Sequence, residues 1–191
     1  MRLKPDEPIL SSTDALRLRA EIVSSRSSIS SVASVVDQSG ALLGPFACLP
    51  YTPQIGDAVQ RVGAALRAES VLPRPLTEAV ILSVAVHWRA DYEWYAHAAV
   101  ARAVLSEEDI ALIGRGELPA DEAIAVAVRL AREVMAGRRA GDEVYDAVAA
   151  HLGAQGTAEL VMFVGYYSML AMLIITFDTP IPDDVLYPWS E

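Results

Sequence analysis

The residues best suited to chemistry gather in one stretch, residues 76–97, which begins apolar and ends in a cluster of histidine, aromatic and charged side chains. Glu93 and His97 are four residues apart, so on a helix they share one face. A carboxylate placed there can orient an imidazole that acts as a general acid or base. The same two side chains can instead form a structural hydrogen-bonded pair between helices. The spacing leaves both interpretations open.

Glu78 lies in the apolar first part of this stretch. If its carboxylate is buried there it needs a partner, whereas on an exposed face of the first turn it is favoured by the helix dipole. The spacing of Glu93 and His97 also suits zinc or iron. No third ligand follows from the spacing, so we predict no metal.

Basic and aromatic side chains complete the cluster. Arg89 can pair with a neighbouring acid, and Trp94 can line a pocket or pack a helix junction. Tyr166 and Tyr167 come from an apolar segment near the C-terminus and are candidates to reach a pocket from across the fold. Core packing is the alternative for at least one of them.

Helix start and stop signals predict about seven helices, and no alternating, strand-like run stands out. The expected helices begin at about residue 13 and then cover 53–66, 76–104, 106–114, 119–136, 142–152 and 158–177. The third of these is either one long helix or two nearly collinear helices, broken near residues 89–91. A turn at 153–156 would precede Thr157, the expected cap of the last helix. This pattern predicts an all-α fold, a compact helical bundle.

Three further segments lack a clear pattern for a regular, stable helix. Residues 1–11 are expected to form an extended arm, and the serine-rich residues 24–34 a weak helix. Residues 42–53 contain three prolines and a glycine, which exclude a regular helix. The apolar residues between the prolines predict a buried loop.

Residues 160–177 carry no charge over a length at the lower edge of a membrane span. The flanking residues are Glu159 and Asp178, not the lysines or arginines that often border spans. A helix that is apolar all round is buried in a core or in a membrane. Because tyrosines lie mid-segment, we expect a central core helix and no membrane partner.

The length, composition and net charge of the chain exclude some classes of function. The chain has 191 residues, enough for one domain with a real core, and is 53% hydrophobic. Its net charge of −10 argues against nucleic acid and anionic lipid as partners. Cys48 is the single cysteine, so it cannot form an intramolecular disulfide, and we expect a small buried hydrophobe. The polar N-terminus lacks a signal-peptide core, so a cytoplasmic location is expected.

The chemistry-bearing stretch resembles the carboxymuconolactone decarboxylase-like family, which includes the alkylhydroperoxidase D-type proteins. Redox-active members carry a glutamate and, after eleven residues, the motif Cys-x-x-Cys-x-x-x-His. Here Glu78 and His97 match the glutamate and the histidine, while Ala90 and Glu93 stand at the two cysteine positions. The chain is therefore similar to a cysteine-free branch of the family.

Other runs support the resemblance, among them Gly44-Pro-Phe and Leu105-Ser-Glu-Glu-Asp. The resemblance covers residues 42–178, which would form the helical domain. Residues 1–41 would be an N-terminal arm and helix, and residues 179–191 an extended C-terminal tail.

The resemblance implies an alkylhydroperoxidase D-like all-α fold that assembles as a homotrimer or homohexamer through apolar helices. It also implies a cofactor-free lyase or isomerase acting on a small cyclic carboxylate or lactone. His97 would protonate a carbanion or enol, and Glu93 or Glu78 would fix its tautomer. The residues expected to bind the substrate are Arg89, Trp94, Tyr166 and Tyr167, with Arg89 or a tyrosine holding an anionic group.

Two other functions remain as alternatives. The first is a non-catalytic small-molecule-binding or assembly protein, in which Glu93 and His97 would form a dry, fully paired network with no cavity. The second is a peroxidase-like antioxidant. Thiol peroxidase chemistry needs a thiolate and a resolving partner, and Ala90 and Glu93 supply neither, so this second alternative is disfavoured.

Overall fold

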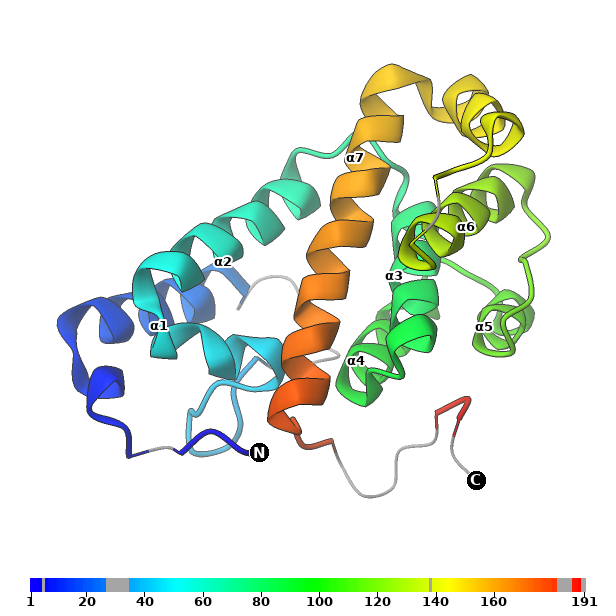
Figure 1. The fold of residues 1–191 in the computed structure, drawn as a ribbon. Helices are drawn as coiled ribbons and strands as arrows, with labels where there is room; N and C mark the ends of the chain where they lie inside the picture. Colours follow the sequence, from blue (N-terminus) through cyan, green and yellow to red (C-terminus); the bar gives the residue numbers. More distant parts are fainter. Residues whose placement is uncertain (5, 27–34, 138, 182–186, 190–191) are drawn as a thin grey trace.

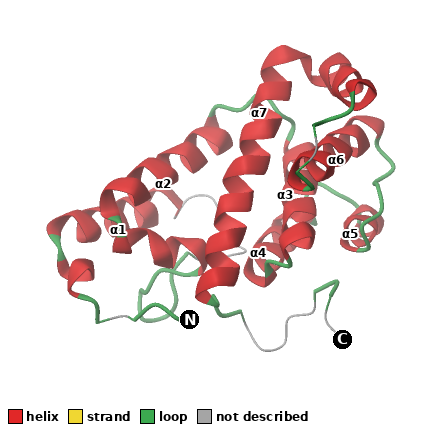
Figure 2. Ribbon diagram, viewed as in Figure 1, coloured by secondary structure: helices red, strands yellow, loops and turns green. Residues whose placement is uncertain are grey.

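The computed structural model describes residues 1–4, 6–26, 35–137, 139–181 and 187–189. Over these residues the fold is all-α, as predicted (Figure 1, Figure 2). The α-helices are α1 (Thr13–Arg26), α2 (Pro53–Ala68), α3 (Arg74–Trp88), α4 (Asp91–Ala101), α5 (Glu107–Gly114), α6 (Glu122–Met135) and α7 (Asp142–Phe177). Two 3-10 helices, η1 (Pro8–Ser11) and η2 (Gly44–Tyr51), complete the described elements.

Helix α7 passes through the middle of the molecule, with α1 and α2 on one side and α3 to α6 on the other (Figure 1). Helix α3 is the core of the second group, because it packs against α4, α6 and α7. Every residue from Leu76 to Ala85 is buried, so this part of α3 has no solvent face. A polar side chain in this run, such as Glu78, must therefore find its partner inside the protein.

The break expected near residues 89–91 separates α3 from α4. Arg89 ends α3 in a left-handed conformation with φ 50°, and the N–H of Ala90 donates to the carbonyl oxygen of Ala85 at 2.9 Å. The segment is therefore two helices, and the expectation that they are nearly collinear is wrong, because α4 packs back against α3. Helix α4 packs against α3 and turns its face with His97 towards Glu78.

Helix α7 is kinked at Gly153, which has φ 66° and ψ −179°. The turn predicted at residues 153–156 is therefore wrong in part, because the helix resumes directly after one glycine. The predicted cap is also wrong: Thr157 lies inside the helix and its Oγ1 donates to the carbonyl oxygen of Gly153 at 2.7 Å. Glycine tolerates the positive φ that this kink requires.

The uncharged half of α7 is partly buried. Among the described residues α7 is the one helix long and apolar enough to cross a membrane. Of its most apolar 18-residue stretch, 44% is buried inside the protein. The buried face includes Phe163, Tyr167 and Ile174, which belong to the main core. The exposed large side chains are Val161, Met162, Met172 and Ile175.

The N-terminal segments differ from expectation in two places. The arm predicted for residues 1–11 contains the 3-10 helix η1, and the loop predicted for residues 42–53 contains η2. Both begin with a proline in the first turn, where its missing N–H has no intrahelical partner to lose. The weak helix expected at residues 24–34 is seen up to Arg26, and the remainder lies outside the described residues.

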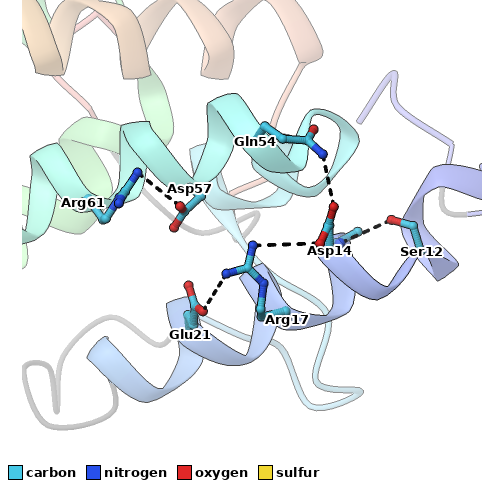
Figure 3. Close-up of polar contacts among 8 residues, drawn as sticks. Ser12, Asp14, Arg17, Glu21, Gln54, Asp57 and Arg61 are labelled. Atoms are coloured by element: carbon cyan, nitrogen blue, oxygen red, sulfur yellow. Dashed lines mark hydrogen bonds and ion pairs between the residues drawn. The ribbon is translucent and has the colours of Figure 1, made fainter.

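Polar contacts attach α1 to α2 (Figure 3). The amide Nε2 of Gln54 donates to Asp14 at 3.1 Å, and Asp14 continues into an exposed ion-pair chain through Arg17 to Glu21. Beneath these contacts a small cluster of Leu18, Ile22 and Leu49 is buried. The apolar cluster holds α1 and η2 beside α2, since exposed ion pairs stabilise little.

Candidate active site

A cavity of about 470 Å³ lies between α2, α3, α4 and α7. Its wall is mostly apolar and aromatic, with a few ionisable side chains. Five of the seven residues predicted for the site line it: Glu78, Glu93, His97, Tyr166 and Tyr167. Apolar pockets with a few converging polar groups are the usual form of small-molecule sites.

His97 is paired with Glu78. The ring Nδ1 lies 2.8 Å from Glu78 Oε2, and the two residues come from neighbouring helices. An ionised carboxylate can only accept a hydrogen bond, so Nδ1 is the donor, and in the neutral imidazole Nε2 then keeps its lone pair. The expected pair of Glu93 and His97 is therefore wrong, and the alternative in which Glu78 fixes the tautomer is the arrangement present.

Glu93 is the unusual group of the cavity. Its side chain is 3% exposed, and neither carboxyl oxygen has a hydrogen-bond partner among the described residues. Burial raises the pKa of Glu93 well above its ordinary value, because an unpaired carboxylate is costly in an apolar environment. Burial therefore favours the protonated form of the carboxyl group, which can donate a hydrogen bond.

Two tyrosines of α7 form the wall opposite α4. The Tyr167 ring meets the His97 ring edge-on at a centroid distance of 5.2 Å, and Phe163 stacks on Tyr167 at 6.0 Å. Burial, and then the charge of Glu78, raises the pKa of the Tyr167 phenol, so it remains a neutral donor. These contacts fix the plane of the imidazole within the cavity.

Glycines allow close contacts at the cavity wall. A Cβ built on Gly63 of α2 would lie 2.0 Å from the Tyr166 hydroxyl oxygen, and one built on Gly44 would meet the ring of Tyr92. A side chain at either position would displace a cavity-lining tyrosine. Burial, with a smaller effect from Tyr95, raises the pKa of Tyr92 to about 12.

The other two predicted site residues lie elsewhere. Arg89 is exposed at the end of α3 and does not line the cavity, so it cannot hold a substrate there. Trp94 is buried in the main core, and its ring lies 6.1 Å from that of Trp189. The left-handed turn at Arg89 explains both positions, because it determines the face of α4 that packs against α3.

Two arginines at the cavity were not predicted. Arg74 precedes Glu78 by four residues, and its Nε lies 3.8 Å from Glu78 Oε1. That spacing is a readable signal in the sequence. Arg67 is in the last turn of α2, and only the packing of α2 beside α7 places it at the cavity.

The described residues include no group of three or more histidine, cysteine, aspartate and glutamate side chains arranged to hold a metal ion. Cys48 is buried, and burial raises the pKa of its thiol to about 11. It does not line the cavity. Of the side chains there, His97 with a free Nε2 and protonated Glu93 supply one proton acceptor and one donor, one helical turn apart on α4.

Comparisons with known proteins identify the fold. No protein-family model and no curated protein matches the sequence. Two solved structures of the debrominase Bmp8 are similar, each with a TM-score of 0.65 over 95% of this chain. The cysteine-to-alanine variant in complex with 2,3,4-tribromopyrrole is 15% identical and covered over 90% of its length, and the apo protein is 14% identical and covered over 91%. Bmp8 has the carboxymuconolactone decarboxylase and alkylhydroperoxidase D-like fold, and this chain shares that all-α fold.

Proposed function

We propose that the protein is a cofactor-free enzyme that moves a proton on a small cyclic substrate, as a lyase or isomerase. The observation that carries the proposal is the unpaired, buried Glu93 beside the Glu78–His97 pair in one cavity. An unsatisfied carboxyl group costs stability, and such groups are concentrated at functional sites. A bound ligand with a carbonyl or hydroxyl oxygen supplies the missing partner.

The arrangement supports a simple division of roles. His97 Nε2 accepts a proton from a carbon next to a carbonyl group, and Glu78 stabilises the imidazolium through Nδ1. The electron pair moves onto the carbonyl oxygen, which takes a hydrogen bond or proton from Glu93. Where a C=C bond of the substrate is conjugated with this enolate, return of the proton to the γ-carbon moves the double bond and completes an isomerisation. For a β-keto acid, His97 Nε2 first takes the proton of the carboxylic acid group, loss of carbon dioxide then gives an enolate, and the imidazolium returns that proton to carbon.

The alternatives are less well supported. A non-catalytic protein with a dry, fully paired network has no need of a cavity of about 470 Å³ or of an unpaired Glu93. Thiol peroxidase chemistry lacks its dithiol, because Ala90 and Glu93 occupy the positions of the two cysteines. The likeness to Bmp8, one variant of which is solved in complex with the ring compound 2,3,4-tribromopyrrole, fits an enzyme that binds a small ring.

Proton exchange with solvent tests the proposal without a known product. A panel of cyclic ketones, lactones and oxo acids is incubated with the protein in D2O, and loss of the C–H signals is followed by NMR. The His97→Asn variant keeps an N–H that can reach Glu78 but has no basic nitrogen. We expect exchange by the wild type and a loss of about 10² to 10⁴-fold in His97→Asn.

The matched control is His151→Asn, because His151 is an exposed histidine of α7 outside the cavity. Its exchange rate is expected to equal that of the wild type. Full activity in a folded His97→Asn variant, or no exchange with any member of the panel, would contradict the proposal.

A further inference from the structure

The ionisable side chains that line the cavity include one more positive charge than they pair. The ionisable residues of its lining are Arg67, Arg74, Glu78, Glu93 and His97, with three phenols in addition. Glu78 has two partners, His97 at 2.8 Å and Arg74 at 3.8 Å. Burial raises the pKa of Glu93 and so favours its neutral form. The positive charge of Arg67 is therefore left over in a protein whose net charge is −10.

Arg67 has no counter-ion among the described residues. No described carboxylate lies within ion-pair distance of it, although the chain has 25 aspartates and glutamates. Arg61, two turns earlier on α2, shows the usual arrangement: its Nη2 lies 3.3 Å from Asp57 (Figure 3). An exposed arginine with no partner at the edge of an apolar cavity is suited to hold an anionic group of a ligand.

The position of Arg67 directs it at the cavity. Gly63 lies four residues earlier on α2, hence on the same face, and it receives the Tyr166 hydroxyl. Arg67 also acts on the interior, since its charge opposes the effect of burial on the pKa of Tyr167. Arg67 is thus an exposed residue of the cavity lining, whereas Glu93 is a buried one.

The neighbouring hydroxyl groups indicate a singly charged ligand. Ser70 donates to Glu159 at 2.6 Å, and Thr77 donates to the backbone carbonyl oxygen of Arg74 at 3.0 Å. These donors are already engaged, and Arg74 is paired with Glu78 at 3.8 Å, so Arg67 is the lining guanidinium with no ion-pair partner among the described residues. Its planar pair of N–H groups matches the two oxygens of a carboxylate, whereas a phosphate dianion is better served by several donors.

We propose that Arg67 is the specificity-determining residue of the cavity and that it selects ligands with a single carboxylate on a small apolar ring. The inference rests on the proposed function only in taking this cavity as the substrate site. Arg67 replaces Arg89 as the residue that holds an anionic substrate. The ring then occupies the aromatic part of the cavity, between α4 and α7.

Binding of matched ligand pairs tests the proposal. Benzoate, cyclohexanecarboxylate and 3-oxocyclopentanecarboxylate are each compared with the corresponding neutral carboxamide by isothermal titration calorimetry at low salt. For at least one pair we expect the wild type to bind the carboxylate about tenfold more tightly. Arg67→Gln should lower carboxylate affinity about tenfold and leave carboxamide affinity unchanged. Arg67→Lys should retain part of the preference, because it keeps the charge without the planar fork.

The control variant is Arg61→Gln, which removes an arginine from the same helix but outside the cavity. It should bind every ligand as the wild type does. The proposal is overturned if no carboxylate binds more tightly than its carboxamide, including the case in which neither binds, or if Arg67→Gln keeps the preference. Binding does not require turnover, so a protein that selects carboxylates through Arg67 but exchanges no proton would refute the proposed reaction alone.

Discussion

Helices α6 and α4 both pack against α3, and each carries a polar side chain that is withdrawn from solvent. These two side chains, Arg132 and Glu93, differ in their hydrogen bonds. Towards α6, Ser83 accepts a hydrogen bond from Arg132 Nε at 3.2 Å, and the same guanidinium donates to the carbonyl oxygens of Gly116 and Glu117 at 2.7 and 2.9 Å. Each nitrogen of this guanidinium has a partner. Towards α4, Glu93 has no partner and faces a cavity.

The difference separates a structural polar group from a functional one. Arg132 ties α6 to the segment between α5 and α6, and its contacts leave no room for a ligand role. Burial of the Glu93 carboxyl group costs free energy, and no hydrogen bond to a described residue offsets that cost. Burial of a polar group alone therefore does not mark a site, but burial without a partner at a cavity does.

The largest expected effect concerns the proton on Glu93. Its pKa is raised in the folded protein, so above about pH 4.5 the folded state holds a proton that the unfolded state has lost. The free energy of unfolding then falls as pH rises, by about 1.4 kcal/mol per pH unit, until pH reaches the folded pKa. Glu93→Gln removes this dependence. Urea denaturation of both proteins from pH 5 to pH 8 measures the difference in slope, and equal slopes would show that Glu93 is ionised in the fold.

On the paired side, Arg132→Met should destabilise the protein by about 2 kcal/mol, because two carbonyl oxygens and Ser83 lose their donor. The matched control is Arg129→Met on the same helix, whose ion pair with Glu133 is exposed and long at 3.8 Å, so its effect should stay within about 0.5 kcal/mol. Chemical denaturation gives both values. Equal losses in the two variants would mean that the Arg132 contacts contribute nothing specific.

The smallest expected effect is the difference in stability between the Trp189→Phe and Trp88→Phe variants. Trp189 Nε1 donates to Asp91 Oδ1 at 2.7 Å, whereas Trp88 Nε1 is buried with no partner among the described residues. Trp189→Phe should therefore cost about 1 kcal/mol more than its lost ring contacts alone. Trp88→Phe is the reference, since it removes an N–H that pairs with nothing described. Thermal unfolding measures both, and the hydrogen bond is unimportant if Trp88→Phe is the more destabilised.

Local sequence signals predicted the helices well where caps and breakers were present. Ser106 caps α5 by accepting from the N–H of Asp109 at 3.0 Å, and the break near Arg89 lies where it was expected. The prediction was wrong where one residue absorbs a bend, as Gly153 does in α7. The oligomeric state, the cytoplasmic location and the choice of substrate stay predictions.

The sequence by itself determined the all-α fold and the identity of the reactive groups, because helical periodicity, caps and rare residue types are local properties. It placed Glu78, Glu93 and His97 in one segment, expected to be one long helix or two nearly collinear helices, so it did not predict that α4 packs against α3. Only the tertiary structure decided which carboxylate holds the imidazole. The i, i+4 spacing put Glu93 on the face of His97, but the left-handed turn at Arg89 brings α4 against α3, so Glu78 reaches the ring and Glu93 is left unpaired in the cavity. The same packing, which no local pattern encodes, excludes Arg89 from the cavity and brings Arg67 to it.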